Sequence, residues 1–315
     1  MFVGSSTGRV FALDAASGQE KWHFPSADNQ TLGNVYATPV LSDSVVYVGA
    51  YDGKFYALDA NDGTMKWSYP TGGPIVGGAA VAAGRVYFGS SDTKLYVLDA
   101  TNGAPVAGFK PFKANGAIWA TPVLANGTVY ISSLDGQLYA LNAETGDLVW
   151  QYKVTGSIPG DPSVAAGRVY AGATDNKLYA LDAAAGTVVW EFQAERWFWA
   201  KPFVLGGVVY VGALDNHFYA LNAENGAKIW DFTTGGVIRG EATTSESAII
   251  FGSADGKAYA LDPATGTQKW QFDAGSPLLA PLSYYRGVVY AHAQDRTVYA
   301  LDASNGAVQW KYQTR

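Results

Sequence analysis

Residues 258–270 read Ala-Tyr-Ala-Leu-Asp-Pro-Ala-Thr-Gly-Thr-Gln-Lys-Trp, and variants of this stretch recur along the whole chain. Each variant has an aromatic residue, then Ala or Val, then Leu, then Asp or Asn, with Gly four residues after the Asp or Asn. The Asp or Asn stands at positions 14, 59, 99, 142, 182, 222, 262 and 302. Eight tandem copies spaced by about 40 residues predict a repeat architecture.

A tryptophan completes the motif in seven of the eight copies. It follows the Asp or Asn by eight residues, as Trp22, Trp67, Trp150, Trp190, Trp230, Trp270 and Trp310. The third copy has Ala107 instead, and departures from the regular spacing predict insertions at residues 26–34 and 110–116. We expect each recurring Trp to be a structural docking residue that is wedged between repeats, with its indole N–H on a backbone acceptor.

Within one repeat, short runs of alternating apolar and polar residues are separated by turn residues. Residues 45–49, 54–59 and 65–69 are such runs, with Asp-Gly at 52–53 and Asn-Asp-Gly at 61–63 between them. This pattern is typical of strands joined by hairpins, and turn chemistry explains the recurring Asp-Gly pairs. A fourth run precedes them at 37–41, so each repeat predicts one four-stranded antiparallel blade. The predicted fold is an all-β, eight-bladed propeller that forms a single domain over residues 1–315.

The first repeat begins directly at its second strand, Met1–Gly4. We therefore expect one blade to lack its innermost strand. An unpaired strand edge is an aggregation hazard, so we also expect the sequence to lack an N-terminal strand or upstream segment.

Composition restricts the possible functions. The chain is 48% hydrophobic and 15% charged, with a net charge of −6 and no run of like charges, which argues against nucleic-acid binding. It contains no Cys, which excludes disulfides and thiolate metal sites. No apolar stretch is long enough for a membrane span, and no signal peptide is visible. His23, His217 and His292 lie in different repeats without ligand spacing, so no metal site is predicted.

Function in a repeat protein is sought where the copies differ, because packing explains the shared residues. One variable position, just before each inner strand, holds Tyr36, Val76, Trp119, Pro159, Trp199, Arg239 and Leu279. Two residues later the chain has Thr38, Gly78, Thr121, Asp161, Lys201, Glu241 and Pro281, and the residue between is always Ala or Gly. The three Trp residues outside the docking rule, Trp119, Trp197 and Trp199, all fall in this region.

These variable residues predict a ligand or partner site at one mouth of the central channel. The candidate set is Tyr36, Trp119, Trp197, Phe198, Trp199, Arg239, Asp161, Lys201 and Glu241. Two alternatives stay open: the rings plug the channel, or the charged residues satisfy one another as an ion-pair network. No catalytic motif such as G-x-S-x-G, H-E-x-x-H or a P-loop is present, so no catalytic residue is predicted.

The motif at Ala260–Trp270 resembles the tryptophan-docking motif of the PQQ-type β-propeller repeat family. The resemblance extends over essentially the whole chain. It implies an extracytoplasmic, monomeric scaffold that binds a protein partner or a small ligand. The propeller lipoproteins of the outer-membrane protein assembly machine and the sensor propellers of membrane-bound kinases are scaffolds of this kind.

The same resemblance allows a second function, a dehydrogenase of alcohols or sugars that depends on PQQ and calcium. In that case Trp119 or Trp199 would stack on the quinone, Arg239 or Lys201 would pair with its carboxylates or carbonyls, and Asp161 or Glu241 would hold the calcium. The large alcohol dehydrogenases of the family use a disulfide of neighbouring Cys residues beside the quinone, and this chain has no Cys. A carbohydrate-binding propeller is a third alternative, because clustered Trp residues suit sugar faces. We expect the non-catalytic scaffold.

Overall fold

The computed structural model of the chain describes residues 1–27 and 29–315, so Asp28, in the predicted insertion at 26–34, lies outside the described residues. The described chain consists of β-strands and their connections, without a helix. No segment among these residues is a helix of the length and apolar character that would cross a membrane. The strands form eight antiparallel sheets in sequence order, and these sheets are the blades of a β-propeller. The predicted all-β, eight-bladed fold is therefore confirmed.

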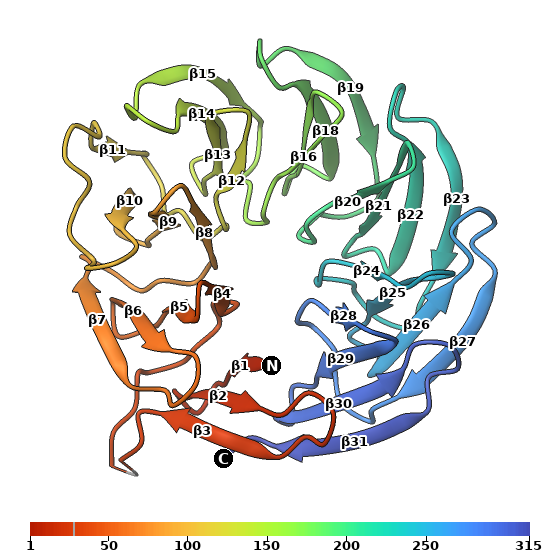
Figure 1. Cartoon of the computed structure of the whole chain (residues 1–315). Helices are drawn as coiled ribbons and strands as arrows, with labels where there is room; N and C mark the ends of the chain where they lie inside the picture. The colour runs from red at the N-terminus through yellow and green to blue at the C-terminus, as the bar shows by residue number, and fades with distance from the viewer. Residues whose placement is uncertain (28) are drawn as a thin grey trace. The chain divides into compact units, whose positions relative to one another are not determined.

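The chain divides into two compact units, residues 1–161 with Arg315, and residues 162–314. Each unit holds four blades, coloured from red to yellow-green in the first and from green to blue in the second (Figure 1).

The blades of the first unit are β1–β3 (Phe2–Gly4, Val10–Leu13, Glu20–Phe24), β4–β7 (Val40–Ser42, Val45–Gly49, Lys54–Asp59, Met65–Pro70), β8–β11 (Ala79–Ala82, Arg85–Gly89, Lys94–Asp99, Phe112–Lys113) and β12–β15 (Val123–Ala125, Thr128–Ser132, Gln137–Asn142, Leu148–Lys153). The blades of the second unit are β16–β19 (Ser163–Ala165, Arg168–Gly172, Lys177–Asp182, Val188–Gln193), β20–β23 (Phe203–Leu205, Val208–Gly212, His217–Asn222, Lys228–Thr233), β24–β27 (Thr243–Thr244, Ile249–Gly252, Lys257–Leu261, Gln268–Asp273) and β28–β31 (Ser283–Tyr285, Val288–His292, Thr297–Asp302, Val308–Gln313). The β1–β3 blade has three strands, as the sequence predicts.

The repeated motif forms the hairpin between the third and fourth strands of a blade. Asp182 Oδ1 accepts the backbone N–H groups of Ala184 and Ala185 at 2.9 and 2.8 Å, and Gly186 then closes the turn with φ of 69°. This Asx turn uses a short acceptor side chain and a residue that tolerates positive φ. Just before this turn, the pairing of β18 with β19 shifts register between Ala180 and Leu181. A β-bulge at this position increases the local twist of the strand.

Five of the recurring Trp residues join their blade to the next one. Their indole N–H groups donate to backbone carbonyls over 3.0–3.1 Å, in the pairs Trp22–Ala60, Trp67–Ala100, Trp190–Ala223, Trp230–Pro263 and Trp270–Ala303. Each ring also covers the glycine of the neighbouring Asx turn, so a Cβ placed on Gly226 would lie only 2.7 Å from the Trp190 ring. The motif thus carries both halves of the joint, a Trp on one blade and an Asp-x-x-x-Gly turn on the next.

The β8–β11 blade, which has Ala107 in place of the Trp, makes this joint differently. Its fourth strand β11 has only two residues, and the chain before it reaches across to the turn of the next blade, where the Lys110 N–H donates to the Thr145 carbonyl at 2.8 Å. The Phe109 ring takes the place of the indole, since a Cβ on Gly146 would lie 2.9 Å from its Cε1 atom. The Ala143 carbonyl accepts hydrogen bonds from Tyr87 Oη (2.9 Å) and Arg85 Nη1 (3.2 Å).

Close packing between neighbouring blades explains why the residue in the middle of each variable triplet is Ala or Gly. A Cβ on Gly77 would lie 2.3 Å from the Trp119 carbonyl oxygen, and one on Gly240 would lie 2.6 Å from that of Ala280. The chains that enter the first strands of adjacent blades therefore approach to backbone contact at these positions, and a larger side chain has no room.

Candidate functional site

The residues that lead from β19 into β20 hold most of the predicted site in the second unit. Backbone hydrogen bonds fix this entry segment, residues 194–201, to both neighbours: Phe198 N–H donates to the Ala173 carbonyl at 3.2 Å, and Leu214 N–H donates to the Trp197 carbonyl at 2.9 Å. Because side chains alternate along an extended segment, its aromatic residues point in different directions. Phe198 is completely buried, whereas Trp197 is 46% exposed and Trp199 is half-buried.

Phe198 belongs to the core rather than to the exposed part of the predicted set. Its ring packs against Phe192 and Tyr219, with ring centroids 6.4 and 6.1 Å apart. A Cβ on Gly172 of β17 would lie 2.4 Å from the Phe198 Cβ, so the glycine makes room for the phenylalanine. The ring therefore anchors the segment that carries Trp197 and Trp199, and it has no surface to offer a ligand.

Trp199 and Arg239 occupy equivalent positions in neighbouring blades, and the structure brings them together. The Arg239 guanidinium carbon lies over the Trp199 ring, 5.2 Å from its centroid. Such a cation–π contact at an exposed site is worth about 0.5–1 kcal/mol. The pair forms a flat, partly cationic surface that is solvent-accessible.

Lys201 and Glu241, two residues further along each entry segment, form an ion pair. Their Nζ and Oε1 atoms are 3.0 Å apart, and their side chains are 31% and 27% exposed. Each charge therefore has a partner inside the protein. This pair agrees with the ion-pair alternative for these two residues.

The predicted aromatic residues of the first unit precede two different blades, Tyr36 before β4 and Trp119 before β12. The exposed Tyr36 ring meets Tyr51 edge to face at 5.6 Å, and its hydroxyl accepts a hydrogen bond from Asn34 Nδ2 at 2.8 Å. The half-buried Trp119 donates its indole N–H to Ser91 Oγ at 3.1 Å. Both rings therefore contact a turn between the second and third strands of a blade, Tyr51 after β5 and Ser91 after β9.

Asp161 is tied to the neighbouring entry segment of the same unit. Its Oδ1 atom accepts the Thr121 N–H at 2.7 Å, and Thr121 Oγ1 accepts the Gly78 N–H at 3.0 Å. Within the first unit, the side chains of Asp161 and Thr121 thus connect residues 78, 121 and 161 by hydrogen bonds. For Thr121 and Asp161, variation between the copies reflects this local bonding.

A set of Asp–Tyr pairs at the same ends of the blades went unrecognised in the sequence. Within the β-turn, Asp215 Oδ1 accepts a hydrogen bond from the His217 backbone N–H at 3.0 Å. Asp215 Oδ2 accepts two more, from the Tyr219 hydroxyl at 2.8 Å and from the backbone N–H of Glu195 in the preceding blade at 3.2 Å. Burial, and then the bond to the carboxylate, raise the pKa of the Tyr219 hydroxyl. Explaining these Asp residues by turn chemistry alone was therefore incomplete. The Asp-x-x-x-Tyr spacing is the signal that could have revealed them.

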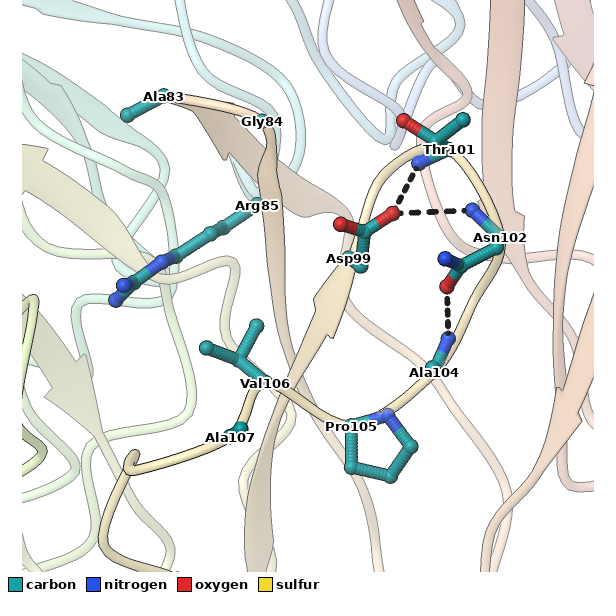
Figure 2. Close-up of a pocket in the computed structure, with 10 residues that line it drawn as sticks. All are labelled: Ala83, Gly84, Arg85, Asp99, Thr101, Asn102, Ala104, Pro105, Val106 and Ala107. Carbon is teal, nitrogen blue, oxygen red and sulfur yellow. Dashed lines mark hydrogen bonds between the residues drawn. The ribbon is translucent and has the colours of Figure 1, made fainter.

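The cavity in Figure 2 lies at the opposite ends of the blade strands. It has a volume of about 440 Å³ and is bounded by the hairpin at Ala83–Arg85 and by residues 99–107 of the divergent β8–β11 blade. Asp99 Oδ1 accepts hydrogen bonds from the backbone N–H groups of Thr101 and Asn102. The Arg85 side chain points away from Asp99 (Figure 2). None of the predicted site residues lines this cavity.

The contacts of Glu241 and Arg239 do not favour a calcium–quinone centre at these two residues. Across residues 1–27 and 29–315, no group of three His, Asp or Glu side chains is placed to hold a metal ion. Glu241 is paired with Lys201, and Arg239 lies over Trp199, one of the two rings predicted to stack on the quinone. Neither contact favours the arrangement that a bound quinone and calcium would need.

Comparison with known proteins identifies the family. The family model described as outer membrane protein assembly factor BamB matches residues 1–108, 105–196, 172–237 and 226–315, which together span the chain. The chain belongs to this family. The predicted resemblance to PQQ-type propellers of the outer-membrane assembly machine is therefore confirmed. A search of curated proteins finds no match.

Solved structures share the propeller fold of this BamB-family chain at low sequence identity. BamB from Moraxella catarrhalis is 24% identical, with a TM-score of 0.76 over 100% of this chain and 91% of that one. The computationally designed protein Ika8 is 16% identical, with a TM-score of 0.79 over 89% and 87% of the two chains. The quinohemoprotein alcohol dehydrogenase ADHIIG from Pseudomonas putida HK5 is 15% identical, with a TM-score of 0.74 over 89% of this chain and 66% of that one. At these identities the likeness concerns the fold alone.

Proposed function

We propose that this chain is a non-catalytic scaffold that binds a protein partner through the exposed part of the second unit's entry segments. The surface consists of Trp197, Trp199 and Arg239, with the Lys201–Glu241 pair beside it. The observation that carries the proposal is the exposed Trp197 next to an Arg239–Trp199 stack, on segments that are anchored by Phe198 and by backbone hydrogen bonds. Trp and Arg on a rigid support are the residue types that dominate binding energy in protein interfaces.

Membership of the family supports a proposal for the process in which this binding takes place. The family is described as an outer-membrane protein assembly factor. We propose that this chain serves in the same process, outside the cytoplasm, and that residues 1–315 act as one domain and as a monomer within a larger assembly. A scaffold in that process needs surfaces for other proteins and no catalytic residues, which agrees with the lack of catalytic motifs in the sequence.

Site-specific crosslinking in the cell that produces the protein tests the proposal. A photoreactive phenylalanine analogue at Trp197 should crosslink to a protein of the outer-membrane assembly machinery, and Trp199→Ala should reduce the crosslink severalfold. The same analogue at Leu205, which is exposed at the far end of β20, is the matched control and should give no such product. Equal crosslinks at both positions, or none at Trp197, would contradict the proposal.

Thermal unfolding of Trp199→Ala distinguishes a binding surface from a structural plug. The Trp199 ring is half-buried and contacts an exposed Arg, so we expect a change in the free energy of unfolding of no more than about 1–2 kcal/mol. A loss of crosslinking with a nearly unchanged melting temperature supports a binding role. A large loss of stability would identify the ring as a plug.

The dehydrogenase is the alternative that the fold likeness to ADHIIG favours. It predicts saturable quenching of Trp fluorescence when PQQ and calcium are added, and loss of that quenching in Trp199→Ala. The scaffold proposal predicts no saturable signal up to about 100 μM PQQ, a concentration that would reveal binding stronger than about −5.5 kcal/mol. Titration with oligosaccharides in the same assay tests the carbohydrate alternative.

A further inference from the structure

Five asparagines of the chain are followed directly by glycine, a sequence in which asparagine can lose its side-chain amide. The backbone nitrogen of the glycine attacks the side-chain amide carbon, a C–N bond forms and ammonia leaves, which produces a succinimide ring. Water then opens the ring at either carbonyl, so that Asp or isoaspartate replaces Asn. Glycine favours this reaction because it has no side chain to hinder the attack. The five pairs are Asn102–Gly103, Asn115–Gly116, Asn126–Gly127, Asn225–Gly226 and Asn305–Gly306.

Three of these pairs are held by two hydrogen bonds in the Asx turns of their blades. Asn225 Oδ1 accepts the Ala227 N–H at 3.0 Å. The attacking nitrogen, that of Gly226, donates its hydrogen to the Asn222 carbonyl at 2.8 Å. Both bonds must open before this nitrogen reaches the amide carbon, so the fold protects the pair. The same two bonds hold Asn102–Gly103 and Asn305–Gly306.

The pair Asn115–Gly116 precedes β12, and its packing restricts it. The Asn115 N–H donates to Asp135 Oδ2 at 2.9 Å. Gly116 lies against the backbone of the turn between β13 and β14, since a Cβ on it would lie 2.4 Å from the Asp135 nitrogen. The Gly116 carbonyl accepts a hydrogen bond from Ser133 Oγ at 3.1 Å. These contacts restrict the backbone rotation that ring closure needs.

The pair Asn126–Gly127 forms the two-residue turn between β12 and β13 and has none of these restraints. Both residues are exposed, with φ of 50° and 76°, and no atom lies within 4 Å of the Gly127 Cβ position. Within the part of the chain that the structure describes, the Asn126 side chain makes no hydrogen bond and the Gly127 N–H donates none. We infer that Asn126 is a site of spontaneous deamidation, because the fold leaves both reacting groups free there. The reaction consumes only water, releases ammonia and adds a negative charge to the turn.

Modification of this turn would also affect the joint of the divergent β8–β11 blade. The Gly127 carbonyl accepts the Ala143 N–H at 2.8 Å. The Ala143 carbonyl in turn accepts the hydrogen bonds from Tyr87 and Arg85, in the blade that lacks a docking Trp. Isoaspartate lengthens the backbone by a methylene group directly before Gly127. We therefore expect it to displace the Gly127 carbonyl and to weaken the joint between the β8–β11 and β12–β15 blades.

Peptide mapping by mass spectrometry, after storage of the folded chain in mildly alkaline buffer, tests the inference. Product should form at Asn126 about thirtyfold faster than at Asn102, Asn225 or Asn305, where two hydrogen bonds of ordinary strength must open first. The rate at Asn115 should lie between these values. In guanidinium chloride, which removes the protection, all five sites should react at similar rates. Faster modification at any other Asn of the folded chain, no product at Asn126, or an Asn126 preference that persists in the unfolded chain would overturn the inference.

Two substitutions sharpen the test. Asn126→Gly should remove the fast product and keep the turn, because glycine tolerates positive φ, as it does in the Gly206–Gly207 turn between β20 and β21. Asn225→Asp is the matched control, because it cannot deamidate and keeps the Oδ1 acceptor; it should leave the fast product unchanged, and loss of that product would contradict the assignment. The isoaspartate form, separated by chromatography, should melt at a lower temperature than the unmodified chain, whereas stored Asn126→Gly should keep its melting temperature. Equal melting temperatures of the two forms would overturn the effect on the joint.

Discussion

The β16–β19 and β8–β11 blades solve the same packing problem with different residues. In the first, Trp190 docks on the next blade, and its indole N–H shares the Ala223 carbonyl with the Arg168 guanidinium and the Tyr170 hydroxyl. In the second, Ala107 stands at the Trp position, and Phe109 supplies the ring two residues later. Tyr87 and Arg85, which correspond to Tyr170 and Arg168, remain as the donors to the equivalent carbonyl, that of Ala143. The comparison shows that the joint requires an aromatic ring over the turn glycine and a donor on the carbonyl, and that one residue need not provide both.

Removal of the Trp190 and Phe109 rings should give the largest difference in stability between the two blades. Trp190→Ala deletes a nearly buried ring and its hydrogen bond, and it should lower the free energy of unfolding by about 3–5 kcal/mol. Phe109→Ala deletes a half-buried ring and should cost roughly 1–2 kcal/mol, since less apolar area is lost. Urea unfolding of both variants measures the difference, and equal losses would contradict the proposed division of roles.

Alanine at two turn glycines should give the next largest contrast. Gly226 has φ of 74° and lies under Trp190, so its Cβ would clash with the ring, whereas Gly84 has φ of 72° with no atom within 4 Å of its Cβ position. We expect Gly226→Ala to cost roughly 2–4 kcal/mol, from strain and overpacking together, and Gly84→Ala to cost only about 1–2 kcal/mol of strain. Thermal melts of the pair separate the packing effect from the backbone effect.

Substitution of Arg85 and of Arg168 should give a smaller difference in stability between the same two blades. Arg85 donates to the Ala143 and Glu144 carbonyls in the blade without a docking Trp, whereas Arg168 donates to a carbonyl that Trp190 also satisfies. Arg85→Ala should therefore cost about 1–2 kcal/mol and Arg168→Ala about half of that. A larger loss for Arg168→Ala in chemical denaturation would show that the Arg contact does not compensate for the missing indole.

Acid titration should give the smallest effect, at the turn between β2 and β3 in the three-stranded first blade. The hydrogen bond from Lys21, followed by those from Ser17 and Ala16, lowers the pKa of the Asp14 carboxyl to about 2. Because the folded-state pKa lies below the unfolded value, the contribution of Asp14 to stability is present above about pH 4 and is lost as the pH falls toward 2. Melting temperatures from pH 5 to pH 2 should fall slightly less for Asp14→Asn than for the wild type. Parallel curves would show that the exposed pair contributes nothing.

Particular residues show how far sequence reasoning reached. The repeat predicted the blades, their hairpins and the three-stranded first blade, because each of these depends on residues close together in the chain. Variation between copies also selected Trp199 and Arg239. It wrongly grouped the buried Phe198 with the exposed Trp197, because it did not follow the alternation of side chains along the entry segment. Phe109 was missed because it lies two residues beyond the expected Trp position.

The sequence by itself determined the number of blades, the strand order and the motif that joins one blade to the next. These features follow from a local pattern that is repeated eight times, so the signal is strong and each copy supports the others. Only the tertiary structure decided which variable residues meet, such as Arg239 over Trp199 or Lys201 with Glu241. Those contacts join residues 40 positions apart, in the segments that precede β20 and β24, and their geometry exists only after the blades have packed against each other.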